Sequence, residues 1–472
     1  MDTINLSPID SGIIIAYFAM ILVIGYFVKK RIKNTNDYFL AGRRLTLPIF
    51  VATLVSTWYG GLLGVGELSF NYGFVNWVTQ GAFWYASYLF FALFLANRIQ
   101  KSGMTTLPDQ LEKFYGKKSR ALGAFFNYIM VTPAPYVLSL GIIFSLFFGW
   151  PGWLGIVFGT IITIFYTVRG GFLADVYTDF IQFVLMCVGV AMIIPFAVSK
   201  FGGIDFLVAN LPATHFTLTG TWTTQMILVW GFIAFWTLVD PGFYQRCYAA
   251  KDDKIPRKGV IISVFFWMLF DVCTTFTGMY ARASMPGIDP LTAYPVFAAS
   301  VLPVFLQGLF FTGVIATVMS TIDSFTFLGA MNISHDIYRK IINPKADDKK
   351  VMKVTKAAIV MTALIALVMA LFFESVVGMW YTIGTIGISA LLVPMMAGFF
   401  WKRKKPELAA LASMILGTLT SVAWLAYGWI NMYEGWPVYL FDIEPLYPGL
   451  LASFVTFMAI SLFYKEGLKK WI

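Results

Sequence analysis

The sequence is poor in charge, cysteine and histidine, and each shortage argues against a class of function. Charged side chains make up 12% of the 472 residues, against about 25% in an average soluble chain. Three cysteines without CxxC spacing and two widely separated histidines provide neither a zinc motif nor a catalytic pair. We also find no glycine-rich phosphate loop and no Ser-His-Asp order. The sequence therefore predicts a protein that is neither soluble nor an enzyme and that uses no organic cofactor.

Long apolar segments take the place of these features. Hydrophobic residues make up 59% of the chain, and the mean hydropathy is +0.75. Apolar runs of about 20 residues, each long enough for a hydrocarbon core of about 30 Å, recur from end to end. The acidic start lacks the basic region and cleavage site of a signal peptide, so we interpret the first run as a retained span. The prediction is an all-α polytopic membrane protein with 13 spans, near residues 10–28, 46–71, 76–98, 119–148, 152–168, 178–200, 223–245, 258–281, 296–333, 354–373, 375–400, 407–430 and 446–464.

The distribution of basic residues predicts an orientation. The net charge of +10 could indicate nucleic-acid binding, but with these spans all but two of the 34 Lys and Arg residues fall on one side, Arg246 among them. Only Lys200 and Arg282 fall on the other. The positive-inside rule makes the basic side cytoplasmic. We therefore expect a plasma (inner) membrane protein surrounded by lipid, with its N-terminus outside and its C-terminus inside, and no nucleic-acid partner.

One apolar span, near 296–333, carries polar side chains at helical spacing. Ser320, Thr321, Asp323 and Ser324 fall within five residues, and on a helix Ser320, Asp323 and Ser324 share one face. Burying such groups in a bilayer is costly. Na⁺, which prefers hydroxyl, carbonyl and carboxylate oxygens, would offset that cost. The alternative is that the hydroxyls bond back to their own helix and that Asp323 lies at its cytoplasmic end.

Two spans contain helix-breaking residues. Ser56, Thr57, Gly60 and Gly61 interrupt the span at 46–71, and Asp240-Pro241-Gly242 interrupts the one at 223–245. Non-helical backbone at membrane depth is tolerated where it lines a cavity or is buried in protein, so we expect carbonyls near residues 54–57 to face an ion. Close helix packing is the alternative role of the small residues. Interrupted spans in corresponding positions predict inverted repeats with a midplane site, and the expected units are 1–45, 46–200, 223–400 and 401–472.

Several segments resemble a known family. DYFLAGRR, STWYGG with GELSFNYG, TTLPDQLEKFYG, RGGFLADVYTDFIQ, DPGFYQRCYAAKD and ATVMSTIDS with SHDIY are similar to the sodium/solute symporter family. Members carry proline, pantothenate, monocarboxylates, sugars and sialic acid with Na⁺. The resemblance runs from about residue 10 to 460. It implies a LeuT-type fold of five-plus-five inverted repeats, with one extra leading span and two trailing ones, working by alternating access.

The resemblance also implies ion sites. The family's common Na⁺ site falls on the carbonyls of Leu54, Thr57 and Thr317 and on the hydroxyls of Ser320 and Thr321. The spacing of Thr317, Ser320 and Thr321 agrees with that role independently. A second Na⁺ site, found in some members, falls on Asp179, Ser320, Asp323 and Ser324. Asp323 stands where some relatives have a hydroxyl, which would strengthen this site or change its stoichiometry.

The substrate residues of the family match this sequence less well than its ion ligands do. The Gln and Asn of the family's sugar carriers correspond to Gly61 and Ile233, so neither is present. Trp236 matches an aromatic residue that closes the pocket from the cytoplasmic side. The pocket implied here is aromatic with few polar groups, which favours an amino acid or carboxylate over a sugar; it comprises Ser56, Trp58, Gly61, Phe235, Trp236 and Tyr381.

These observations predict a secondary transporter that couples Na⁺ entry to uptake of a small solute. Two alternatives stay open. One is H⁺ coupling through Asp179 and Asp323, although the hydroxyl pair Ser320 and Thr321 favours Na⁺ because a proton site needs a titrating group. The other is a nutrient sensor built on a transporter scaffold and acting with a separate partner.

Overall fold

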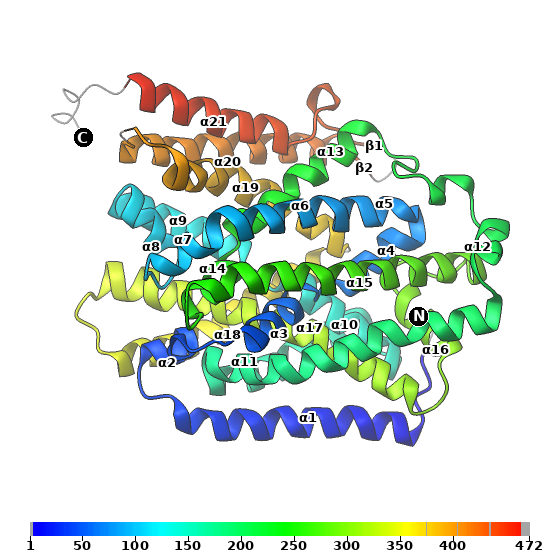
Figure 1. The fold of residues 1–472 in the computed structure, drawn as a ribbon. Coiled ribbons are helices and arrows are strands. Elements are labelled where there is room, and N and C mark those ends of the chain that lie inside the picture. Colours follow the sequence, from blue (N-terminus) through cyan, green and yellow to red (C-terminus); the bar gives the residue numbers. More distant parts are fainter. Residues whose placement is uncertain (1–2, 374, 404, 434–435, 464–472) are drawn as a thin grey trace.

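The computed structural model describes residues 3–373, 375–403, 405–433 and 436–463 and is almost entirely helical. Figure 1 shows the long helices lying side by side in one bundle, in which α1 begins at one end and α21 finishes at the other. The described strands are two short ones, β1 (Met432–Tyr433) and β2 (Trp436–Pro437), paired antiparallel. The α-helices are α1 (Pro8–Val28), α2 (Thr35–Leu40), α3 (Leu47–Trp58), α4 (Leu62–Tyr72), α5 (Phe74–Asn76), α6 (Phe83–Phe90), α7 (Ala96–Lys101), α8 (Leu107–Phe114), α9 (Lys117–Met130), α10 (Ala134–Phe148), α11 (Gly152–Phe201), α12 (Ile204–Asn210), α13 (Thr224–Ile233), α14 (Pro241–Ala249), α15 (Lys254–Ser284), α16 (Ala293–Val301), α17 (Leu306–Met331), α18 (Asp348–Phe372), α19 (Val376–Phe400), α20 (Glu407–Ile430) and α21 (Leu446–Phe463).

Most spans agree with the hydropathy pattern, but the predicted span at 296–333 divides into α16 and α17, and only the segment Leu306–Ile342 is long enough to cross a membrane. Within the described residues, eleven helical segments are long and apolar enough to cross a membrane, and the bent pair α3–α4 makes a twelfth. The predicted span at 152–168 corresponds to a shorter apolar helix, Gly152–Phe165, which belongs to α11. In α11 the backbone turns at Gly171, which has a φ of 56°. The count of 13 therefore remains a prediction, whereas a polytopic all-α architecture is confirmed.

Both predicted helix breaks are present. α3 and α4 meet at an angle of 57° across residues 59–61. α13 passes into a 3₁₀ segment, η6 (Ala234–Val239), before Asp240 caps α14 by accepting a hydrogen bond from the Phe243 N–H. Pro241 cannot donate a backbone hydrogen bond and so occupies the first turn of the new helix.

The neighbours of Gly60 and Gly61 explain why the first break needs glycine. A Cβ at position 60 would lie 2.0 Å from Thr321 Oγ1, and a Cβ at position 61 would lie 1.9 Å from the Trp380 ring. Two consecutive residues therefore contact two different partners, one on α17 and one on α19.

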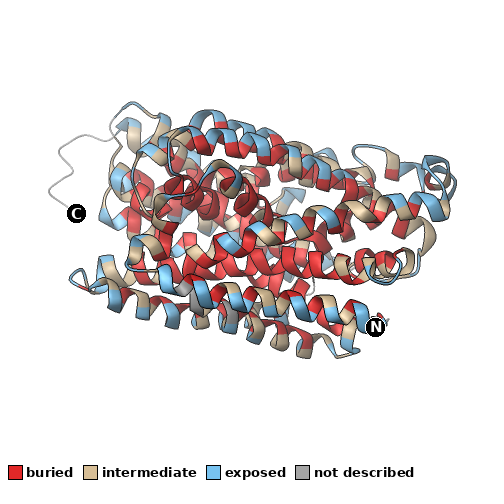
Figure 2. Ribbon diagram, turned by 60° about the horizontal axis from the view of Figure 1, so that its bottom comes forward, coloured by how far each residue is buried: buried red, intermediate tan, exposed pale blue. Residues whose placement is uncertain are grey.

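The centre of the bundle is α17, which packs against α1, α3, α10, α11 and α18. All of its residues from Gly308 to Met331 are buried except Leu309. Figure 2 shows the buried residues concentrated in such inner helices and the exposed residues on the outer faces. The outer helices α1, α20 and α21 expose large apolar side chains, including Phe27, Leu419 and Phe454, as expected for surfaces that face lipid.

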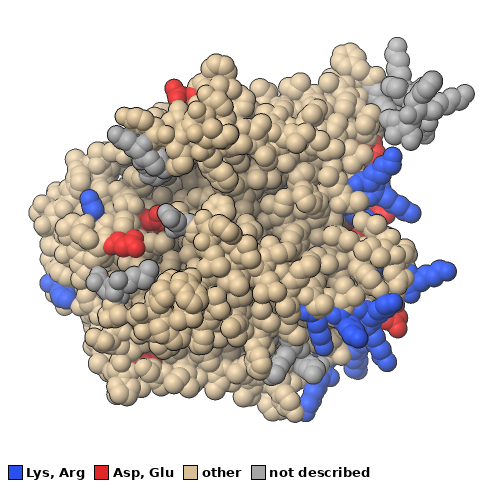
Figure 3. Space-filling model, turned by 180° about the vertical axis from the view of Figure 1, so that it is seen from behind, with Lys and Arg blue, Asp and Glu red and all other residues tan. Residues whose placement is uncertain are grey.

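The charged side chains are unevenly distributed along the bundle. In Figure 3 most of the Lys and Arg side chains visible on this face gather at one end, the end at which α21 finishes. This basic end agrees with the loop asymmetry of the sequence. One predicted member of that basic loop set, Arg246, lies elsewhere, as described below.

Candidate functional site

The hydroxyls of α17 face the broken helix α3–α4. Ser320 Oγ donates to the Ser56 carbonyl across the helix interface at 2.8 Å. It also lies 2.9 Å from the carbonyl of Thr317, which belongs to the same helix. Thr321 Oγ1 donates to the Thr317 carbonyl at 3.2 Å and lies beside Gly60. Both side chains are fully buried. Back-bonding within the helix therefore accounts for Thr321 but not for Ser320, which also reaches α3.

The predicted ligands of the first Na⁺ site lie on these two helices. Leu54 and Thr57 are buried near the end of α3, and Thr317 is buried one turn before Ser320. The carbonyls in the last turn of a helix have no partner within that helix. In this structure the α3 carbonyl that contacts Ser320 is that of Ser56, which sequence analysis assigned to the substrate pocket. Hydroxyl and carbonyl oxygens thus converge beside the break, which is the ligand chemistry that Na⁺ needs.

Next to these hydroxyls lies a buried arginine. Arg246, on α14, has no exposed surface. Its Nη2 donates to Thr57 Oγ1 at 2.7 Å, Ser324 Oγ at 2.8 Å and Thr53 Oγ1 at 3.2 Å. The same nitrogen lies 3.8 Å from a carboxylate oxygen of Asp175 and 3.8 Å from one of Asp179.

The position of Arg246 corrects one expectation. Sequence analysis placed Arg246 in a solvated cytoplasmic loop, whereas it lies inside the bundle beside two carboxylates of α11. The two carboxylates offset the cost of removing the guanidinium from water. Sequence analysis missed Asp175 altogether, although it lies one helical turn before Asp179 and therefore on the same helix face.

The residues expected to form a second Na⁺ site do not converge on one empty position. Asp179 accepts a hydrogen bond from Thr53 Oγ1, and Ser324 Oγ donates to Asp175 Oδ2 at 2.6 Å. Asp323 points to a different part of α11, where it accepts from Thr167 Oγ1 at 2.7 Å. Asp179 and Ser324 are linked through Arg246, and Asp323 is not part of that ion pair.

On the other side of the break lies an aromatic cavity of about 670 Å³, counted to its solvent-open mouth. Phe243 packs beneath it, with ring centroids 5.2 Å from Trp58 and 5.7 Å from Tyr88, and is itself buried. The lining residues come from α3, α4, α6, α10, α13, α15, α19 and the intervening segments, and are Trp58, Tyr59, Gly61, Val65, Gln80, Trp84, Tyr88, Tyr136, Trp230, Ile233, Trp236, Trp267, Asp271 and Trp380.

The cavity contains half of the predicted substrate residues. Trp58, Gly61 and Trp236 line it. Ser56 is buried on the ion side, and Phe235 packs against Phe232 with centroids 5.7 Å apart. The Tyr381 hydroxyl donates to Glu444, and its ring lies 6.0 Å from that of Trp230. Ser56, Phe235 and Tyr381 are therefore not among the residues that line the cavity.

Asp271 is the one carboxylate among the cavity-lining residues of the described chain. Its two oxygens accept hydrogen bonds from the hydroxyls of Tyr59 at 3.0 Å and Tyr85 at 2.6 Å. Asp271 is not among the residues that the sequence predicts for the substrate pocket. Its place in a wall of aromatic rings depends on the packing of α15 against α4 and α6, which no local pattern encodes.

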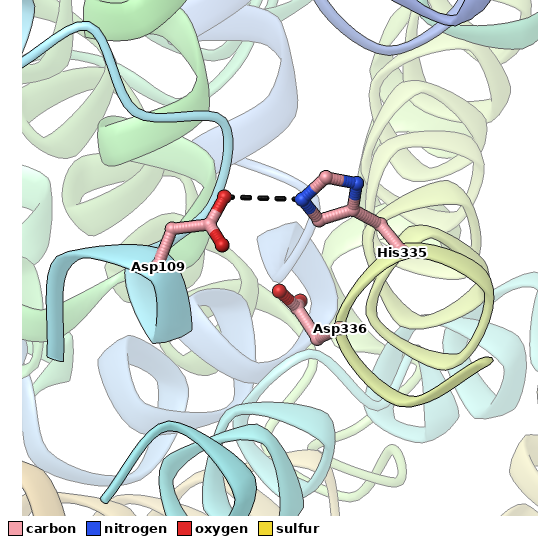
Figure 4. Close-up of side chains that lie close together, drawn as sticks. All are labelled: Asp109, His335 and Asp336. Carbon is pink, nitrogen blue, oxygen red and sulfur yellow. Dashed lines mark hydrogen bonds and ion pairs between the residues drawn. The ribbon is translucent and has the colours of Figure 1, made fainter. Parts of the chain in front are cut away.

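A separate polar cluster lies at the basic end, where α8 meets the π-helical segment η7 (Asn332–Ile342) that follows α17. Figure 4 shows the His335 ring directed at Asp109, with the Asp336 side chain pointing toward the gap between them. His335 Nε2 and Asp109 Oδ2 are 3.0 Å apart, and Thr106 Oγ1 donates to Asp336 at 2.6 Å. The ligand atoms of the three residues lie within 4.8 Å of one another, as a metal site would require.

Positive charge already faces this cluster. Lys340 Nζ lies 3.5 Å from Asp109 Oδ1. Although burial opposes it, the hydrogen bond and charge of His335, with the charges of Lys340 and Arg120, lower the pKa of Asp109 to about 2. The Asp109 carboxylate is therefore already paired with positive charge. We interpret the cluster as a structural contact that joins α8 to η7.

Comparison with known proteins identifies the family of this chain. The family model described as "Sodium:solute symporter family" matches residues 38–417. The chain belongs to the sodium:solute symporter family. Among its relatives is the high-affinity proline transporter PutP of Bacillus subtilis, 26% identical over 468 residues, covering 93% of this chain and 95% of the relative. The high-affinity choline transporter 1 of Drosophila melanogaster is 27% identical over 406 residues, covering 80% of this chain and 64% of the relative.

The solved structures confirm the fold of this symporter. A Na⁺-coupled sialic acid symporter, described in a substrate-bound outward-open state, superposes with a TM-score of 0.82 at 19% identity, covering 98% of this chain and 99% of that one. Family membership shows that the protein is a multi-pass membrane transporter with Na⁺ as coupling ion and a small solute as cargo, and not an enzyme. The LeuT-type architecture expected from the sequence is likewise confirmed.

Proposed function

We propose that this symporter takes up a small amino acid, binding it in the aromatic cavity with its ammonium group directed to Asp271. The observation that carries this proposal is the position of Asp271 in a cavity wall that also contains six tryptophans. An ammonium group is attracted to the faces of aromatic rings, most strongly to Trp, and to a carboxylate. A sugar offers no positive charge for either interaction.

The carboxylate of an amino acid would find donors in the same cavity. Gln80, Trp230 and Trp267 line it, and their side-chain N–H groups have no hydrogen-bond partner among the described residues. These nitrogens are buried in this conformation, so a ligand carboxylate would accept from them once the side chains turn toward it. A buried N–H without a partner is costly, so a ligand that accepts from it gains that free energy. Donors for a carboxylate favour an amino acid over choline, because choline has no carboxylate. The relatives named as proline transporters support the same solute class.

For the coupling ion, we propose the first Na⁺ site at Leu54, Thr57, Thr317, Ser320 and Thr321. The convergence of Ser320 and Thr321 on α3 beside Gly60 supports this assignment. We place the basic end of the bundle in the cytoplasm, with the N-terminus outside and the C-terminus inside.

Uptake into proteoliposomes tests the proposal. With an inward Na⁺ gradient we expect accumulation of radiolabelled proline, inhibited by other small amino acids and unaffected by choline or glucose at equal concentration. Without Na⁺, uptake should fall to the level of empty liposomes. Accumulation of choline or glucose in place of amino acids would refute the solute class, and uptake driven by a pH gradient without Na⁺ would refute the ion assignment.

A further inference from the structure

Two of the four residues predicted to bind a second Na⁺ lie beside a positively charged side chain of the protein itself. Of the residues expected to bind that ion, Ser324 receives a hydrogen bond from Arg246 Nη2 at 2.8 Å, and Asp179 lies 3.8 Å from the same nitrogen. Asp175 is equally close at 3.8 Å. The guanidinium therefore contacts the oxygen atoms that would otherwise surround an ion.

The surroundings hold this guanidinium firmly in place. Arg246 has no exposed surface, and its guanidinium carbon lies 5.2 Å from the centroid of the Phe172 ring. Thr53 and Thr57 of α3, Ser324 of α17 and the two carboxylates of α11 surround Nη2, while Nη1 donates to Gln245 Oε1 at 3.2 Å. Two of the three hydroxyls that accept from Arg246 in turn donate a hydrogen bond to a carboxylate, Thr53 to Asp179 and Ser324 to Asp175.

A Na⁺ ion bound by Asp179 and Ser324 would be in direct contact with this positive charge. Two unit charges a few ångströms apart in a water-free interior repel each other by several kcal/mol. Of the two remaining predicted ligands, Asp323 accepts a hydrogen bond from Thr167, and Ser320 donates to the Ser56 carbonyl. The donor set therefore does not fit a second Na⁺ while Arg246 is present.

We propose that Arg246 takes the place of a second coupling ion, so that this symporter binds one Na⁺ per transport cycle. The guanidinium supplies the positive charge that the Asp175 and Asp179 carboxylates require. It also links α14, which follows the second helix break, to α3, which precedes the first. The proposal rests on Na⁺ coupling and is independent of which solute is carried.

The decisive experiment measures Na⁺ binding without solute. Equilibrium binding of ²²Na⁺ to purified protein in detergent should saturate at one ion per chain, with a Hill slope of one. Arg246→Gln removes the charge and keeps the polar amide, so we expect its slope to rise toward two and its stoichiometry to reach two. Arg246→Lys, the matched control, keeps the charge and should remain at one ion.

Two outcomes would overturn the proposal. The first is binding of two Na⁺ ions by the unmodified protein. The second is a stoichiometry that stays at one in folded Arg246→Gln. If Arg246→Gln does not fold, the double variant Arg246→Gln/Asp175→Asn removes both members of one buried ion pair together and leaves less uncompensated charge; it should bind two ions, and one ion would refute the proposal. A failure of amino-acid uptake would leave these measurements unaffected.

Discussion

The two sides of the α3–α4 break are built in opposite ways. On the α17 side, hydroxyl, carbonyl and carboxylate groups are closely hydrogen-bonded, and Ser320 and Thr321 have no exposed surface. On the α19 side lies a solvent-open cavity with aromatic walls and, among the described residues, one carboxylate. A small ion needs a few oxygen atoms at fixed positions, which neighbouring residues of one helix can supply. An organic solute needs volume and shape, which only the assembly of many helices provides.

The largest effect is expected from removing the charge of the cavity. Asp271→Asn keeps the shape of the side chain but loses the charge-assisted interaction with an ammonium group, worth about 1.5–3 kcal/mol. The solute concentration for half-maximal uptake should then rise by roughly 10- to 100-fold. Na⁺ binding without solute should be unchanged, and Asp253→Asn, which removes a carboxylate paired with Lys101 outside the cavity, should behave like the unmodified protein. A cavity that recognises solutes without this charge would show equal affinity in both variants.

Removing one hydroxyl on the ion side should weaken the binding of Na⁺ and not the binding of solute at saturating Na⁺. Ser320→Ala and Thr321→Ala each delete one proposed Na⁺ ligand, at a cost of about 1–3 kcal/mol. The Na⁺ concentration for half-maximal uptake should rise by roughly fivefold or more. Thr317→Ala, which keeps the backbone carbonyl, serves as the matched control. If Ser320→Ala and Thr321→Ala show the same Na⁺ dependence as the control Thr317→Ala, the hydroxyls do not bind the ion.

Gly60 and Gly61 are adjacent but face opposite sides of the break, so substitutions at these two positions test the ion side and the solute side separately. An added methyl group would meet Thr321 in Gly60→Ala and the Trp380 ring in Gly61→Ala. Overpacking costs about 1–3 kcal/mol, so we expect roughly a fivefold or greater loss in each. Solute-free Na⁺ binding should weaken in Gly60→Ala, and solute affinity at saturating Na⁺ should weaken in Gly61→Ala. Identical defects in the two variants would mean that the break acts as one unit.

The smallest effects should come from the aromatic residues placed outside the cavity. Phe235 packs against Phe232, and the Tyr381 hydroxyl donates to Glu444. Phe235→Ala and Tyr381→Phe should therefore change solute affinity by less than about twofold, since neither removes a group from the cavity wall. Trp236→Ala, which does, provides the positive control. A large loss of affinity in Tyr381→Phe would restore that residue to the binding site.

The same contrast explains what sequence analysis could predict. Ser320, Thr321, Asp323 and Ser324 stand out because they share one helix, so their spacing alone predicts a polar site in an apolar span. The two breaks were found because Gly60-Gly61 and Asp240-Pro241-Gly242 act locally on the backbone.

Tertiary packing decided the rest. Trp84 comes from α6, and Trp267 and Asp271 come from α15, which is far from α6 in the chain. Nothing in their local sequence distinguishes a cavity wall from a core. Arg246 was assigned to the loop charges because it lies one residue beyond the predicted end of the span at 223–245. Its partners, Asp175 and Asp179, lie on α11, and only the folded chain shows that they compensate its charge.

The buried guanidinium also limits how steeply the solute can be concentrated. With Arg246 in place of a second ion, each cycle carries one Na⁺ with a net neutral amino acid, so one positive charge crosses the membrane. A potential of 100 mV contributes about 2.3 kcal/mol per charge, and a tenfold Na⁺ gradient adds about 1.4 kcal/mol. The sum of about 3.7 kcal/mol supports an accumulation ratio of roughly 500, and a second Na⁺ would square that ratio. An organism using this protein therefore imports at half the ionic cost of a two-ion carrier, but it cannot deplete its surroundings to the same concentration.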